Sequence, residues 1–283
     1  MAVQKILLDR MPVLFDRRKA HAESLEIKEE KMVSLGVFLL QEMTRFNEMI
    51  SSMQGQLKML DRAIKGLVVM SADLEAMYNN FLFNQVPTRW TDKGNGYPTL
   101  QPLASWIEDF FGRLDFVKSW LIDGPPKTFW LSGFFFPQGF MTAVKQSYSR
   151  KYHIAVDTLL VGCELTKVLN HEDMPHKPED GAYIYGMYMQ GARFDTGTMF
   201  MHPSLPKIIF DQMPCILLVP MLKEKFSLKG CYTCPVYKTS ERRGTLSTTG
   251  HSTNFVVALG VPSEESEDHW TRAGAAMLLM LDA

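Results

Sequence analysis

Few residues in this 283-residue sequence could carry chemistry, and the cysteines are the first to test. Cys231 and Cys234 form a single C-x-x-C pair inside a predicted strand. Because successive strand residues point to opposite faces, two residues three apart face away from each other and chelate a metal poorly. A zinc site would also need His171, His176 or Cys215 brought near by the fold. We therefore expect two structural cysteines and no bound metal.

Motifs for nucleotide binding or catalysis are absent from the sequence. It contains neither G-x-x-x-x-G-K-[ST], which cradles phosphates, nor the dinucleotide motif G-x-G-x-x-G. Positions 250–254 begin like the nucleophile elbow G-x-S-x-G, but the fifth residue is Asn254 rather than glycine. Asp195 and Asp211 have no visible acid or base partner. The sequence therefore predicts no catalytic residue, no cofactor and no specific binding of ATP.

The most unusual stretch is a long polar loop over positions 238–254, which is rich in serine and threonine. Hydroxyl groups at this density satisfy either their own backbone or that of a partner. An arginine pair in it also fits the preference of basophilic kinases, although a solvated loop is the simpler explanation. Four residues of this loop are candidate partner contacts: Lys238, Arg242, Arg243 and His251.

The first 127 residues are predicted to form a helical bundle. Apolar residues alternate in steps of four and three between positions 39 and 67, which is a heptad seam. Gly66 is predicted to end this helix and Ser71 to cap the next one. A further helix is expected over 100–121, before a glycine and two prolines. We expect the seam to pack within the chain, with a homodimeric coiled coil as the alternative.

The remaining residues, 128–283, are predicted to be rich in strands. The aromatic run 129–136 has the length of a buried strand, and Pro137 fits the first turn of a following helix. Short apolar segments bounded by Gly, Pro, Asn or Asp then indicate further strands. They occupy 158–165, 182–193, 207–210, 216–219, 232–238 and 254–259, and the apolar segment 270–281 is expected to pack back on them. The predicted fold is α+β, an N-terminal helical bundle followed by a small antiparallel β-barrel.

The composition of the sequence limits the classes of partner and the cellular compartment that we expect. The formal net charge is -1, from 30 basic and 31 acidic side chains, which gives no general attraction to nucleic acid or to an anionic membrane. No window of eighteen consecutive apolar residues is present, and the start lacks the apolar core of a signal peptide. Four cysteines in so long a sequence favour a reducing compartment, and hence the cytoplasm.

The long helix has apolar residues off its seam as well as on it. Two apolar faces on one helix indicate burial on two sides. We expect the second face to meet a partner, and the isolated protein to self-associate through it. On this expectation, replacing Phe38 and Met49 by glutamate leaves the protein folded but monomeric. The off-seam residues are Met32, Leu35, Phe38, Leu40, Met49 and Met59, of which Phe38, Met49 and Met59 are the candidate contacts.

Several motifs resemble the C-terminal domain of dynein heavy chains in its axonemal version. The clearest are CPVYKT at 234–239, RGTLSTTGHSTN at 243–254 and WLSGFFFPQ at 130–138. Further matches follow in family order at 63–66, 150–152, 178–183, 191–193 and 205–208. The resemblance extends from about residue 30 to the end. The first thirty residues match less clearly, and the tail of a preceding ring module is one interpretation of them.

The resemblance implies a position in a motor. Dynein heavy chains are microtubule motors with a six-module AAA+ ring, and their last segment is a helical bundle and a small barrel that bridges modules. It carries no nucleotide site. We therefore expect a non-catalytic cap whose partners are AAA+ modules of the same heavy chain and, through them, microtubules and other dynein subunits, in the axoneme of a cilium or flagellum. The alternative is a free-standing adaptor that binds a peptide through its barrel loop.

Overall fold

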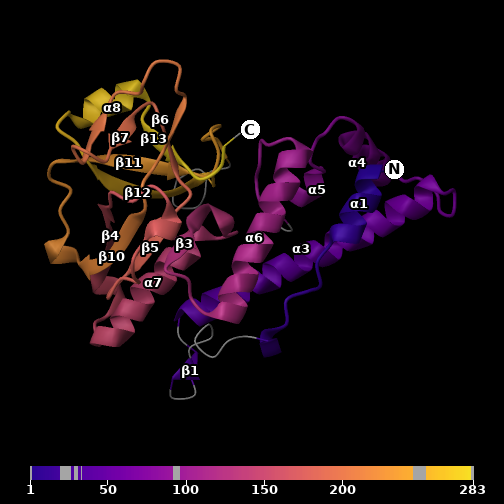
Figure 1. The fold of residues 1–283 in the computed structure, drawn as a ribbon, viewed down its shortest axis with the longest axis horizontal. Coiled ribbons are helices and arrows are strands. Elements are labelled where there is room, and N and C mark those ends of the chain that lie inside the picture. The colour runs from indigo at the N-terminus through magenta and orange to yellow at the C-terminus, as the bar shows by residue number, and fades with distance from the viewer. Residues whose placement is uncertain are drawn as a thin grey trace.

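The N-terminal part of the molecule, from α1 to α6, is built around one long helix, and we call it the helical half. The computed structural model describes residues 2–19, 27–28, 31–32, 34–91, 96–244 and 253–281. In Figure 1 the long helix α3 runs beneath α6, and α1 and α4 lie beside it toward its C-terminal end, away from the sheets. The elements are α1 (Ala2–Arg10), the short pair β1 (Ile27–Lys28) and β2 (Lys31–Met32), α3 (Ser34–Ile64), α4 (Ala72–Leu82), α5 (Thr88–Thr91) and α6 (Leu103–Asp123).

The heptad seam of α3 packs inside the molecule, as expected, so it is not available to a second copy. Its members from position 39 to 60 are all buried, whereas Leu67 lies past the helix end and is 67% exposed. Gly66 ends the helix in a left-handed conformation, with φ 71°. The Ser71 side chain then accepts a hydrogen bond from the Leu74 N–H at 3.4 Å and caps α4. The buried members are Leu39, Met43, Phe46, Ile50, Met53, Leu57 and Leu60.

The aromatic run after the helical half is a strand for only part of its length. The strand β3 (Thr128–Trp130) is followed by a 3-10 turn at Leu131–Gly133, so the expected strand over 129–136 was wrong beyond Trp130. The reason lies in where the backbone polar groups find partners. Arg113 donates to the Ser132 carbonyl, and the N–H groups of Phe135 and Phe136 donate to the Glu42 carboxylate of α3. Side chains therefore replace a neighbouring strand here. The helix after it, α7 (Pro137–Tyr152), begins with its proline at the first position, as predicted.

The β half, which follows the helical half from β3 on, forms two larger sheets and the separate two-stranded pair β7–β8, rather than one closed antiparallel barrel. One sheet has the order β3-β5-β10-β4 and the other β12-β11-β13-β6-β9. The pairs β3–β5 and β11–β13 are parallel, so the all-antiparallel barrel was wrong. The bounds are β4 (Leu159–Leu165), β5 (Ala182–Tyr185), β6 (Tyr188–Gln190), β7 (Arg193–Asp195), β8 (Phe200–His202), β9 (Phe210–Gln212), β10 (Ile216–Leu222), β11 (Cys231–Tyr237), β12 (Phe255–Pro262), α8 (Glu267–Ala273) and β13 (Ala276–Leu278).

Three details of the strands differ from expectation. Lys207 has a left-handed backbone, with φ 68°, so the predicted strand 207–210 begins only at its last residue, in β9. The segment 182–193 breaks at Gly186, where φ is 86° and an added Cβ would lie 2.5 Å from the Trp130 ring. It therefore contributes β5 and β6 to different sheets. The C-terminal segment packs back on the sheets, as expected, but as a strand inside one of them, with Met277 opposite Val236.

A continuous hydrophobic core joins the two halves. Phe38 of α3 lies 4.9 Å from Phe134 and 5.6 Å from Phe140, measured between ring centroids. Trp120 of α6 lies 5.0 Å from Phe129. The helices and the sheets therefore cannot loosen independently at this junction. Among the described helices, none combines the length and the apolar character that crossing a membrane requires.

Candidate functional site

The predicted partner face on α3 is covered by the molecule itself. Phe38 is 3% exposed and Met49 is 1% exposed, so the contact predicted for them was wrong, and the expected self-association loses its basis. The helix does have two apolar faces, but one packs on α6 and the other on α7 and the segment before it. Met59 is 42% exposed and is the one candidate of the three that can meet a partner.

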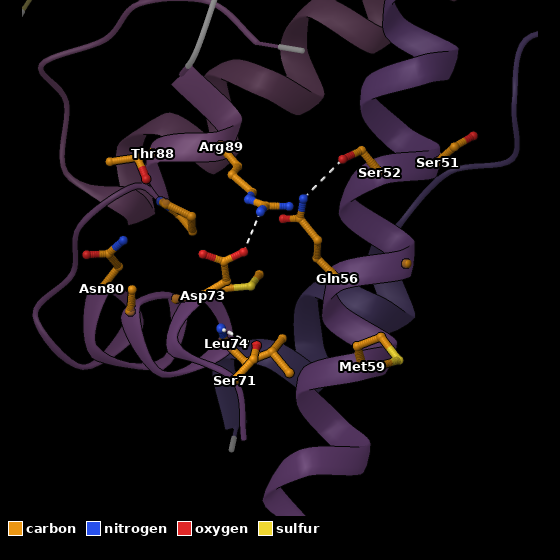
Figure 2. A pocket seen from close by; sticks show the side chains of 14 residues that line it. Ser51, Ser52, Gln56, Met59, Ser71, Asp73, Leu74, Asn80, Thr88 and Arg89 are labelled. Atoms are coloured by element: carbon orange, nitrogen blue, oxygen red, sulfur yellow. Dashed lines mark hydrogen bonds and ion pairs between the residues drawn. The ribbon is translucent and has the colours of Figure 1, made fainter. Parts of the chain in front are cut away.

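Met59 borders a groove of about 400 Å³ between α3, α4 and α5. Figure 2 shows that polar side chains of the groove point toward one another. Arg89 pairs with Asp73, and Gln56 donates to the Ser52 hydroxyl at 3.1 Å. The Gln56 carbonyl in turn accepts from the indole N–H of Trp90 at 2.9 Å. These groups hold the three helices together, so their hydrogen-bonding and charged atoms already have partners within the molecule.

A second concavity, which we call the junction cleft, lies where the helical half meets the β half. Its volume is about 510 Å³. It contains two of the loop residues predicted to contact a partner, Lys238 and Arg243, and adds Arg45 of α3. The aromatic side chains lining it are Tyr97, Phe135 and Phe136. The structure therefore assembles this site from four separated parts of the sequence.

The two loop arginines have different roles. The Arg242 guanidinium donates to the Gln190 side chain at 2.6 Å and to the Gly274 carbonyl at 2.8 Å. It therefore braces β6 against the end of α8, while Arg243 is exposed. The backbone of Arg242 is left-handed, with φ 54°, and its side chain points into the β half, unlike that of Arg243. His251 lies outside the described residues.

A buried carboxylate positions the wall of the junction cleft. Glu42 of α3 is 1% exposed and accepts hydrogen bonds from the N–H groups of Phe135 at 2.7 Å and Phe136 at 3.2 Å. Burial raises the pKa of Glu42 to about 7, although the two backbone hydrogen bonds and the positive charges of Arg45 and Arg113 oppose the shift. Nothing in the sequence pattern distinguished Glu42 from the solvated charges of the same helix.

Replacing Glu42 by glutamine is expected to flatten the pH dependence of stability. The folded pKa of about 7 lies above the ordinary value of 4.5, so the folded state holds a proton that the unfolded state has lost. This contribution is complete below pH 4.5 and is lost as the pH rises through 7, a change of about 3 kcal/mol. Denaturant titrations from about pH 4.5 to 8 measure it as the wild-type minus variant difference in unfolding free energy. Glu48→Gln, at an exposed position of the same helix, is the control. A difference that stays constant over this range would contradict the prediction.

The cysteines have the geometry predicted for structural residues. In β11 the side chains alternate, with Cys234 buried and Cys231 partly exposed, so the two face away from each other as predicted. Burial raises the pKa of Cys234 to about 12 and that of Cys163 to about 11. Thiols with such pKa values stay protonated near neutral pH and are poor nucleophiles and ligands. Among the described residues, no group of three potential metal ligands comes together.

Asp195 stabilises the turn that follows it in the sequence. Its carboxylate accepts from the Gly197 N–H at 3.2 Å and from the Thr198 hydroxyl at 3.1 Å, and the hydrogen bond from Gly197 is the main cause that lowers its pKa. Nε2 of His202 lies 2.9 Å from that hydroxyl and 3.9 Å from the carboxylate. A catalytic triad needs the carboxylate on the other ring nitrogen, so this cluster is not one.

Comparisons with known proteins agree with this architecture. The family model for the C-terminal domain of dynein heavy chains matches residues 1–279, which include the first thirty residues. The sequence is 42% identical to dynein axonemal heavy chain 12 of Homo sapiens over 282 residues, covering 100% of this protein and 9% of that one. It is 43% identical to dynein axonemal heavy chain 3 of Homo sapiens over 276 residues, 98% of this protein and 6% of that one. It is also 43% identical to dynein axonemal heavy chain 1 of Mus musculus over 249 residues, 88% of this protein and 6% of that one. The 283 residues thus span less than a tenth of these relatives, and they belong to the family formed by the C-terminal domains of dynein heavy chains.

Proposed function

We propose that the protein is the non-catalytic C-terminal cap of an axonemal dynein motor ring. It packs on AAA+ modules of the same heavy chain and modulates ATP-driven motility along microtubules in the axoneme of a cilium or flagellum. The family match over residues 1–279 carries this proposal, together with identities of 42% and 43% to proteins named as axonemal dynein heavy chains. Microtubules and other dynein subunits are indirect partners.

The shape and rigidity of the molecule support a role as a cap. The helix α3 has 31 residues. At 1.5 Å per residue it is about 46 Å long, long enough to bridge neighbouring modules of a ring. Because the core is continuous from α3 into the sheets, a force on the helical half reaches the β half without a flexible joint. Such a body can couple ring modules without a nucleotide site of its own.

We place a ring contact at the far end of α3, in the turn that leads to α4. Val69 is 90% exposed and Met70 is 39% exposed, beside Leu67 and Met59. Exposed apolar side chains gathered in this way mark interaction sites. In Figure 1 this turn projects from the helical half, on the side away from the sheets. It takes the place of the face first predicted around Phe38 and Met49.

Val69→Glu with Met70→Glu, introduced into the full heavy chain, is expected to change motility without changing nucleotide affinity. Charges at an apolar contact weaken docking of the cap, while the nucleotide sites lie in other modules. Microtubule gliding velocity and microtubule-stimulated ATPase rate are the measurements, and at least one is expected to change by about twofold or more. Val13→Glu, at another exposed apolar position, is the control. Unchanged velocity and rate in the double variant would reject this placement of the contact.

The alternative function is a free-standing adaptor that binds a peptide through its barrel loop. It predicts a different sequence upstream of this segment in the gene. The natural reading frame would then lack P-loop modules upstream of this segment. Sequencing the transcript on that side distinguishes the two functions, because only the cap requires those modules in the same polypeptide.

A further inference from the structure

The junction cleft offers an apolar wall that the molecule leaves uncovered. Phe136 is 45% exposed, whereas its neighbour Phe134 is buried at 2%. Leu100, which also lines the cleft, is 40% exposed. The volume of about 510 Å³ lies within the range of about 300–1,000 Å³ typical of ligand sites. An exposed ring in a concavity of this size can receive an apolar side chain.

The rim of the cleft is positively charged. The Arg45 guanidinium lies 5.9 Å from the centroid of the Phe136 ring. None of the ion pairs found among the described residues involves Arg45 or Arg243. Glu241 is the one acidic side chain among the described lining residues, since nearby Glu42 is buried and both its oxygens accept backbone N–H groups. Two arginines from different halves of the molecule thus face the same space.

The described part of the loop that carries Arg243, residues 238–244, is held in place by hydrogen bonds. The Asn254 side-chain amide donates to the Thr239 hydroxyl at 2.8 Å and to the Arg243 carbonyl at 3.0 Å. Its carbonyl accepts from the Thr239 N–H at 2.9 Å. With Arg242 bound inside the β half, the residue before Arg243 and the Arg243 carbonyl are both anchored. A rim fixed before binding lowers the entropic cost of capturing a ligand.

We propose that the junction cleft binds an acidic peptide segment of a partner protein, with an apolar side chain against Phe136 and carboxylates paired with Arg45 and Arg243. Guanidinium groups bind carboxylates through two parallel hydrogen bonds, which a planar fork of donors favours. The exposed Phe136 ring beside Arg45 suits a peptide, which brings an apolar side chain together with its carboxylates, better than a compact phosphate group. The cleft would hold such a segment whether or not the protein sits on a motor ring.

Fluorescence anisotropy with the 283-residue protein and a labelled peptide tests this site. The probe is a short peptide with several glutamates around a central phenylalanine, and we expect saturable binding that weakens with added salt. Arg45→Glu with Arg243→Glu is expected to weaken binding by about tenfold or more, because two attractive pairs become repulsive. Arg62→Glu, the same change at an exposed position of the same helix, should leave the affinity within about twofold.

A charge swap separates lost recognition from lost folding. The double variant should bind a peptide in which lysines replace the glutamates, and the wild-type protein should not. A misfolded variant cannot show this reversal. Three results would overturn the proposal: no saturable binding of the acidic peptide by the wild-type protein, unchanged affinity in the double variant, or displacement of the peptide by an equal concentration of ATP, which would assign the cleft to phosphate.

Discussion

Phe38→Glu is expected to unfold both halves of the molecule together. The Phe38 ring is 3% exposed and packs against Phe134 and Phe140 of the β half and Trp120 of α6. A glutamate there loses the aromatic contacts and places a charge among buried aromatic rings. Such changes cost about 4 kcal/mol or more, a large part of the stability of a typical domain. Chemical denaturation and hydrogen exchange measure the loss.

Val37→Glu provides the matched comparison, since Val37 is 39% exposed on the neighbouring position of the same helix. It is expected to change the free energy of unfolding by less than about 1 kcal/mol. In Phe38→Glu, amide protection should fall in α6 and in α7 to a similar degree. Loss of protection in only one half would show that the halves do not share a core, in conflict with the packing around Phe38.

The helices could be predicted because their signals are local. The seam of α3 depends on residues three and four apart, and its end at Gly66 depends on a single left-handed residue. The same pattern could not say what covers each face. It indicated two apolar faces on α3, but only the three-dimensional structure shows that Phe38 meets Phe134 rather than a partner.

The sheets were harder to predict because their pairing is long-range. The alternation of β11 indicated a strand but not its neighbours, which are β12 on one side and the parallel strand β13 on the other. A strand of three residues, such as β13, is too short to show the alternation of apolar and polar residues by which a strand is recognised in a sequence. For the same reason the break at Gly186, set by the nearby Trp130 ring, left no decisive mark in the sequence.

Part of the candidate site was present in the sequence and part was not. The polar loop identified Lys238 and Arg243, because a long run of hydroxyl and basic residues is unusual. Arg45 and Phe136 join them from positions far away in the sequence. Both looked ordinary, one as a solvated charge beside the seam and the other as a core aromatic. Their shared cleft exists only because the two halves dock as they do.

Arg113→Met is expected to destabilise the joint between the halves as strongly as a core substitution. The Arg113 side chain is 1% exposed. Its Nε donates to Asp109 at 2.6 Å, another nitrogen donates to the Ser132 carbonyl, and the guanidinium lies 4.1 Å from the centroid of the Tyr97 ring. Methionine fills the space but leaves the carboxylate and the carbonyl without a cation. Removing one partner of a buried pair costs about 3–5 kcal/mol.

A double-mutant cycle shows whether the loss comes from the unpaired carboxylate. Adding Asp109→Asn to Arg113→Met removes the charge but keeps an acceptor for the Tyr97 hydroxyl, which donates to Asp109 at 3.0 Å. We therefore expect the double variant to be more stable than Arg113→Met alone. Lys118→Met, at an exposed position of the same helix, should stay within about 1 kcal/mol of the wild-type protein. Hydrogen exchange should locate the loosening at the backbone around Ser132, where the guanidinium replaces a neighbouring strand. Equal stability of Arg113→Met and the wild-type protein would mean that the aromatic packing alone holds this joint.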